Sequence, residues 1–128
     1  MNIKSIGKHI IGDYTNFYGN EYLFGNFVFN TMIESIEKNT KMKILHKKLE
    51  ILNEDTPPGF TCILLLDESH FSAHAYTGSG KGMLAIDLFT CGDSKINAVI
   101  DYFNTKLFEF HPEVKLNFMD KIPRFIVA

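Results

Sequence analysis

Apolar residues along this chain follow two periodic patterns, and the commoner one is that of β-strands. A continuous apolar run covers residues 60–66 and is long enough for one buried strand. Two more short strand-like segments follow it after turns of only a few residues, which favours antiparallel pairing. The pattern as a whole predicts strands at residues 7–14, 41–52, 60–67, 71–76, 83–90 and around 114–118, followed by a tail at 121–128.

Two other segments repeat apolar side chains at every third or fourth position, which is the period of an amphipathic helix. The first helix is expected at about residues 25–39. The second is expected to begin after Asp93-Ser94, which can supply an N-cap, and its apolar face is formed by Ile96, Val99, Ile100, Phe103 and Leu107. The order strand, helix, four strands, helix, strand is typical of an α+β fold. We therefore expect a two-layer α/β sandwich, in which two helices pack on one face of a mostly antiparallel sheet.

Length, charge and cysteine content limit the class of protein. A chain of 128 residues has room for one modest hydrophobic core, so residues 1–128 are expected to form a single domain. A net charge of −2 argues against nucleic acid as a partner, because phosphate binding needs a basic surface. We expect no membrane span and no signal peptide, since no apolar stretch has the required length. The two cysteines, Cys62 and Cys91, are too few for a disulfide framework, which predicts a cytoplasmic protein.

The densest group of reactive side chains lies between two predicted strands, in residues 67–74. A serine between a carboxylate and a histidine suggests a hydrolase, but Ser69 lacks the Gly-x-Ser-x-Gly elbow and no triad can be verified. His70 and His74 share one face of a strand, yet no third ligand has a suitable context, so no metal site is expected. The glycine-rich segment 77–82 departs from the phosphate-loop motif at its first and last positions, and we interpret it as a hairpin turn.

Two motifs together point to a family. Glu68-Ser69-His70-x-Ser72-x-His74 is followed by Asp87-x-Phe89-Thr90-Cys91-Gly92-Asp93, and the pair closely resembles the prokaryotic S-adenosylmethionine decarboxylase family. Members of that family are small pyruvoyl-dependent enzymes that are made as proenzymes. The opening segment Ser5-Ile6-Gly7-Lys8-His9-Ile10 also resembles the first strand of the family, with Lys8 where arginine is common. The resemblance runs over most of the chain, in the same order and with nearly the same spacing.

The resemblance implies that the chain cleaves itself between Glu68 and Ser69. The Ser69 hydroxyl would attack the carbonyl carbon of Glu68 and convert the peptide bond to an ester. A β-elimination would then divide the chain into residues 1–68, the β chain, and residues 69–128, the α chain. Residue 69 would become a covalent pyruvoyl group, which is the implied cofactor; no metal is implied.

The resemblance also assigns the remaining catalytic roles. It makes His74 the base of the processing reaction, and it gives the Thr61 hydroxyl, where serine is usual, the stabilisation of the processing intermediate. In the decarboxylation, the pyruvoyl carbonyl would form a Schiff base with the substrate and accept the electrons released with CO₂. Cys91 matches the proton donor to the substrate α-carbon, since a thiol titrates close to neutrality. Cys62, inside the apolar run, we assign to packing.

Assembly and product also follow from the resemblance. It implies a homodimer of cleaved protomers with active sites at the interface. The small-molecule product would be decarboxylated S-adenosylmethionine, the aminopropyl donor of spermidine and polyamine synthesis.

The residues that select the substrate depart from the family pattern. Members usually continue after the second histidine with Thr-Trp-Pro-Glu, whereas this chain has Ala75-Tyr76-Thr77-Gly78. Tyr76 can still stack on adenine. Asp55 aligns with a second stacking position, and its carboxylate would also suit the cationic tail of arginine or ornithine. S-adenosylmethionine is the expected substrate; a pyruvoyl-dependent arginine or ornithine decarboxylase is one alternative, and a non-catalytic dimeric ligand-binding relative is another.

Overall fold

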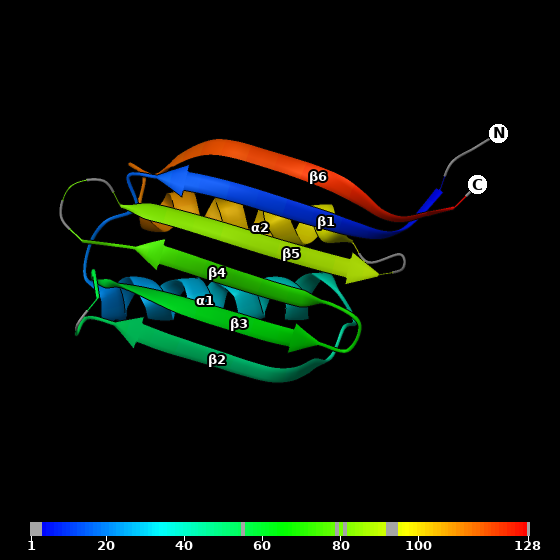
Figure 1. Cartoon of the computed structure of the whole chain (residues 1–128), viewed down its shortest axis with the longest axis horizontal. Helices are drawn as coiled ribbons and strands as arrows, with labels where there is room; N and C mark the ends of the chain where they lie inside the picture. The colour runs from blue at the N-terminus through cyan, green and yellow to red at the C-terminus, as the bar shows by residue number, and fades with distance from the viewer. Residues whose placement is uncertain (1–3, 55, 79, 81, 92–94, 128) are drawn as a thin grey trace.

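The computed structural model describes the backbone of residues 4–54, 56–78, 80, 82–91 and 95–127, and these form one six-stranded sheet and two helices. The elements are β1 (Lys4–Thr15), α1 (Glu21–Asn39), β2 (Ile44–Leu52), β3 (Gly59–Leu66), β4 (His70–Tyr76), β5 (Met83–Cys91), α2 (Ile96–Phe110) and β6 (Lys115–Val127). The strands lie in the order β2-β3-β4-β5-β1-β6, and every neighbouring pair is antiparallel. Both helices cover the same face of the sheet (Figure 1), which confirms the predicted two-layer α/β sandwich.

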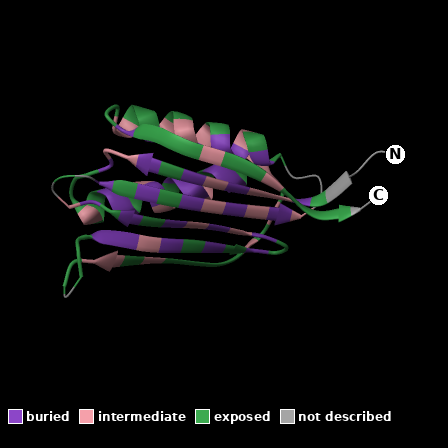
Figure 2. Ribbon diagram, turned by 45° about the horizontal axis from the view of Figure 1, so that its top comes forward, coloured by how far each residue is buried: buried purple, intermediate pink, exposed green. Residues whose placement is uncertain are grey.

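Alternate residues along each strand point toward the helices and form the core. On β4, Phe71, Ala73 and Ala75 are buried, whereas His74 and Tyr76 are exposed. Figure 2 shows the same alternation of buried and more exposed residues along the neighbouring strands. The helices contribute the buried side chains of Val28, Met32, Ile36, Val99, Phe103 and Leu107. The other side of the sheet is covered by neither described helix, and we call it the open face.

The first residue of α1 differs from what the spacing of apolar residues alone indicates. α1 starts at Glu21, four residues before the predicted start, because the Asn20 side chain accepts a hydrogen bond from the Leu23 N–H at 2.9 Å and caps the helix. α2 starts at Ile96. The predicted capping residues 93–94 lie outside the described part of the chain. Within that described part, no helix combines the length and the hydropathy needed to cross a membrane.

The predicted tail at 121–128 is wrong, because β6 continues to Val127. β6 pairs with β1 from Lys115, opposite Thr15, to Val127, opposite Lys4. Pro123 has no N–H to donate, but β6 is an edge strand, where a proline can direct its missing donor away from the sheet. β1 is itself longer than predicted and offers hydrogen-bonding groups along this whole length.

The glycine-rich segment between β4 and β5 is a connection between two paired strands, as predicted. Gly82 lies against the backbone of Phe17, and a Cβ atom built on it would stand 2.0 Å from the Phe17 carbonyl oxygen. The Phe17 N–H donates to the Gly82 carbonyl oxygen at 3.3 Å. This glycine is therefore required for a close backbone approach. Ser79 and Lys81 of the same segment lie outside the described residues.

Candidate active site

Ser69 lies at the end of the tight turn that joins β3 to β4. The Leu66 N–H donates to the Ser69 carbonyl oxygen at 2.9 Å, and the Asp67 N–H donates to the Lys43 carbonyl oxygen at 3.1 Å. Ser69 is only 8% exposed, and its hydroxyl oxygen accepts a hydrogen bond from the Cys91 N–H at 3.3 Å. The fold therefore fixes the serine of the first motif directly beside the cysteine of the second.

The two cysteines lie in different surroundings, and neither forms a disulfide. Cys62 points into the core, where burial raises the pKa of its thiol to about 12, and its Sγ donates to the Met32 sulfur at 3.5 Å. This environment fits the predicted packing role. Cys91 is the last residue of β5, half-buried, and lines a cavity of about 550 Å³ that Glu68 also lines. Cys91 is thus the thiol that a substrate could approach.

Thr61 and His74 form a second pair on the open face. They are directly opposite each other on β3 and β4. The Thr61 hydroxyl and His74 Nδ1 are 2.5 Å apart and hydrogen-bonded, with the direction set by the histidine tautomer. The two residues that the family resemblance assigned to processing are therefore in contact with each other.

Within one chain, however, the two pairs are separated. Ser69 lies in the turn before β4, and His74 is four residues beyond His70, the first residue of that strand, which is on the order of 13 Å at about 3.3 Å per residue. Tyr76 lies two residues further on the same face and is exposed. The structure therefore brings Ser69 to Cys91 and Thr61 to His74, but not one pair to the other. Asp55 lies outside the described residues.

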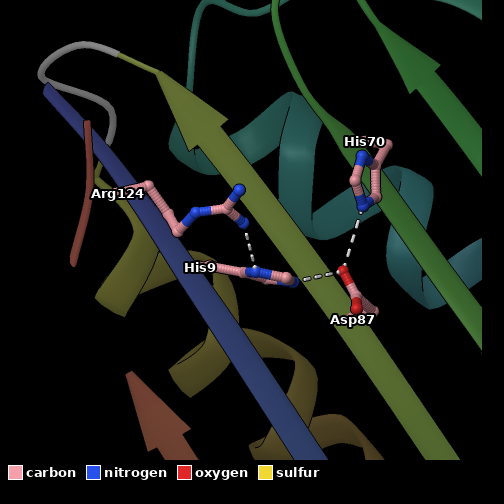
Figure 3. Close-up of polar contacts among 4 residues, drawn as sticks. All are labelled: His9, His70, Asp87 and Arg124. Carbon is pink, nitrogen blue, oxygen red and sulfur yellow. Dashed lines mark hydrogen bonds and ion pairs between the residues drawn. The ribbon is translucent and has the colours of Figure 1, made fainter. Parts of the chain in front are cut away.

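A polar cluster that the sequence did not predict lies on the open face and includes His70, the residue after Ser69 (Figure 3). The Asp87 Oδ1 atom of β5 accepts hydrogen bonds from His9 Nε2 at 2.8 Å and from His70 Nε2 at 3.0 Å. His9 belongs to β1 and His70 to β4, so one carboxylate links three adjacent strands. The Arg124 side chain of β6 lies 3.0 Å from His9 Nδ1 and extends this network to a fourth strand.

The ligand atoms of His9, His70 and Asp87 lie within 4.8 Å of one another, as a metal site would require. The hydrogen bonds favour another interpretation. Because the Arg124 guanidinium donates to His9 Nδ1, that nitrogen is an acceptor and the proton of neutral His9 is on Nε2, which faces Asp87. A metal-bound histidine instead donates its second N–H to an acceptor. The cluster is therefore better described as a hydrogen-bonded network that holds His70 in place.

The sequence contained part of the signal for this network. Strand alternation places His9, His70 and Asp87 on the face opposite the apolar residues. What it did not contain was the pairing of β5 with β1, which joins His9 and Asp87 across 78 positions of the chain.

The fold and the site define a small α+β protein in which a buried serine, next to a partly exposed cysteine, ends a strand turn. The sequence profile of S-adenosylmethionine decarboxylase matches residues 8–117. The chain therefore belongs to the S-adenosylmethionine decarboxylase family, as the two motifs predicted.

Several curated proteins named S-adenosylmethionine decarboxylase proenzyme are similar to this chain. The protein of Thermosipho melanesiensis is 32% identical over 95 residues, which is 71% of this chain and 65% of the relative. The protein of Archaeoglobus fulgidus is 32% identical over 111 residues, or 84% of this chain and 89% of the relative. The protein of Aquifex aeolicus is 34% identical over 105 residues, or 81% and 73%. The match thus spans slightly less than two thirds of the first relative and more of the other two.

Proposed function

We propose that this protein is a self-processing, pyruvoyl-dependent decarboxylase of S-adenosylmethionine. Its product would be decarboxylated S-adenosylmethionine, an aminopropyl donor for spermidine synthesis. The observation that carries the proposal is the buried Ser69 hydroxyl held on the Cys91 N–H, with Glu68 on the preceding side of the turn. The relatives' shared name supports the substrate, and the word proenzyme in it supports self-processing.

The geometry of Ser69 fits a residue that is converted into the cofactor. The Ser69 hydroxyl attacks the Glu68 carbonyl carbon, and transfer of the acyl group from nitrogen to oxygen gives an ester. A base removes the Cα proton of residue 69, the bond between its Cβ and the ester oxygen breaks, and Glu68 leaves as a carboxylate. The remaining enamine becomes an imine, water replaces its nitrogen as ammonia, and a pyruvoyl group is left.

Processing needs Thr61 and His74, which lie far from Ser69 in the same chain, so we propose that a second copy supplies them. The open face is suited to such a partner because it presents several large apolar side chains that are exposed in one chain. These are Ile63, Leu65, Tyr76, Met83 and Phe118. In a two-fold symmetric dimer, Thr61 and His74 of each protomer act on Ser69 of its partner. Tyr76 of each protomer likewise reaches the active site of its partner.

In the mature enzyme, the pyruvoyl group on residue 69 would link to the substrate amino group and supply the electron sink for the electrons released as CO₂ leaves. Cys91 then donates a proton to the substrate α-carbon. Its thiol is the reactive group at the cavity beside Glu68. Tyr76 stacks on the adenine ring, and the Asp55 carboxylate is of the charge that would suit the cationic part of the substrate.

Denaturing mass spectrometry of the purified protein tests the first half of the proposal. Two chains are expected, residues 1–68 and residues 69–128, the second beginning with a pyruvoyl group. A single uncleaved chain would contradict the enzymatic function and favour a non-catalytic ligand-binding relative.

Release of CO₂ tests the second half. Cleaved protein is incubated separately with carboxyl-labelled S-adenosylmethionine, arginine and ornithine. We expect turnover of S-adenosylmethionine alone. Turnover of arginine or ornithine instead would keep the chemistry but overturn the substrate.

A further inference from the structure

The cavity beside the proposed cleavage site is lined by lysines that the reaction described so far does not use. Its lining includes Glu68, Cys91 and, among the described residues, the three lysines Lys38, Lys41 and Lys95. Lys38 lies in the last turn of α1, Lys41 in the loop that follows, and Lys95 directly before α2. Three separate positions of the chain thus contribute lysines to the lining of one cavity of about 550 Å³.

The Lys38 side chain also has a defined position. Its ammonium nitrogen lies 5.4 Å from the centre of the Tyr102 ring, and the hydroxyl of Tyr102 donates to a Glu34 carboxylate oxygen at 2.8 Å. A hydrogen bond to Tyr102 raises the pKa of Lys38, so this lysine stays charged at neutral pH. Contacts between the two helices therefore fix the position of one of the three lysines that line the cavity.

Self-cleavage creates a negative charge at the same place. When the bond between Cβ of residue 69 and the ester oxygen breaks, both electrons of that bond stay on the oxygen, and the main-chain carboxyl group of Glu68 becomes a carboxylate. The proton removed from Cα of residue 69 goes to the base. The neutral ester thus becomes an anionic leaving group, which neighbouring cations stabilise more strongly than the ester itself.

We propose that Lys38, Lys41 and Lys95 form a carboxylate-binding pocket that stabilises Glu68 as it leaves and then holds the new chain end away from residue 69. This inference rests on the proposed self-cleavage. The carboxylate of the substrate is a poorer match for the pocket. Cations that held it would stabilise the ground state and oppose its loss as uncharged CO₂.

The test compares two triple variants that remove the same number of charges. Lys38→Gln/Lys41→Gln/Lys95→Gln removes the pocket lysines, and Lys43→Gln/Lys47→Gln/Lys115→Gln removes three lysines that do not line this cavity. All six side chains are exposed, so both variants should fold, and thermal unfolding checks this. Freshly translated chains are followed by gel electrophoresis with and without hydroxylamine, which cuts the ester between residues 68 and 69.

We expect the pocket variant to be cleaved about tenfold more slowly, equivalent to about 1.4 kcal/mol, and to accumulate a hydroxylamine-sensitive ester. The second triple variant should be cleaved at the rate of the unmodified chain. Added salt should slow cleavage of the unmodified chain and have little effect on the pocket variant, because salt screens exposed charges. A carbodiimide should also link the terminal carboxylate of Glu68 to one of the three lysines in the cleaved protein.

Three results would overturn this inference. Equal cleavage rates in the two triple variants would show that the pocket lysines do not assist cleavage. Slow cleavage without ester accumulation would place their effect before the elimination. A raised KM for the substrate with unchanged cleavage would assign them to the substrate carboxylate. Absence of cleavage in the unmodified chain is a different result, since it contradicts the proposed function itself.

Discussion

The hydroxyl of Ser69 has one geometric role and one chemical role, and substitution separates them. It accepts a hydrogen bond from the Cys91 N–H, and it is the proposed nucleophile. We expect Ser69→Ala to abolish cleavage, because no other atom of the side chain can form the ester. Mass spectrometry should then find one intact chain, whereas Ser72→Ala, three residues further on in β4, should still give two. Any fragment beginning at residue 69 in Ser69→Ala would contradict the mechanism.

Cys91 should affect a later step than Ser69. We expect Cys91→Ala to permit cleavage but to lower the rate of CO₂ release by about a hundredfold or more, the usual range for loss of a general acid. Cys62→Ala is the matched control. Cys62 is buried against Met32, so its loss should lower the melting temperature and leave the turnover of folded enzyme nearly unchanged. Equal loss of turnover in both variants would contradict the role of Cys91.

At the scale of single residues, the sequence predicted which side chains are reactive better than it predicted which side chains are in contact. The two motifs named Ser69 and Cys91, and the structure places them in contact. The contact of His9 with Asp87 was not predictable in the same way. That contact depends on β1 and β5 being neighbours in the sheet, and the two sequence motifs do not show which strands are neighbours. The separation of His74 from Ser69 likewise follows only once His74 is placed within β4 and Ser69 in the turn before it.

Elements were predicted well wherever a segment buries one face, and less well where hydrogen bonding alone decides. Buried residues alternate with more exposed ones along β4 and recur at every third or fourth position in α2, so burial itself produces both sequence patterns. Residues 121–127 show no such alternation, yet they form part of β6 because β1 pairs with all of them except Phe125. The start of α1 at Glu21 was missed for a related reason. The start of this helix is set by one hydrogen bond to the Asn20 side chain and not by the spacing of apolar residues.

The contact between sheet and helix at Tyr14 gives a prediction about pH. Tyr14 is buried, its hydroxyl donates to Asn104 of α2, and burial raises its pKa above the usual value of 10.0. The unfolded chain releases this proton near pH 10 while the folded chain keeps it. Tyr14 thus adds no pH dependence below that pH, and stability falls as the pH rises above it.

Tyr14→Phe should therefore have two effects. It should cost about 1 kcal/mol at neutral pH through the lost hydrogen bond, and it should remove the part of the alkaline fall that begins near pH 10. Urea unfolding across that pH range measures both. Tyr22→Phe is the comparison, because it removes the same atom from an exposed tyrosine. An unchanged alkaline fall in Tyr14→Phe would refute the assignment.

At the scale of the whole molecule, the sharing of sites between copies can be tested by complementation. Ser69→Ala and His74→Ala should each remain uncleaved when produced alone. In a mixed dimer, the His74→Ala chain keeps its own Ser69 and receives Thr61 and His74 from the Ser69→Ala partner. We expect cleavage to appear on co-expression, and every fragment that begins at residue 69 should carry the His74→Ala substitution.

A site contained in one chain would behave differently in that experiment. Cleavage would stay absent in the mixture, because neither chain holds both groups. Such a result would require a large rearrangement of β4, since Ser69 lies just before its first residue and His74 near its other end.

The separation of Thr61 and His74 from Ser69 has a consequence for when the enzyme becomes active. If two copies must meet before either can be cut, maturation is second order at low concentration, and each new chain waits for another. The half-time of cleavage should then lengthen as the freshly made protein is diluted, and reach a constant value once every chain is paired. The amount of protein that a cell makes would thus set the delay before its first molecule can turn over substrate.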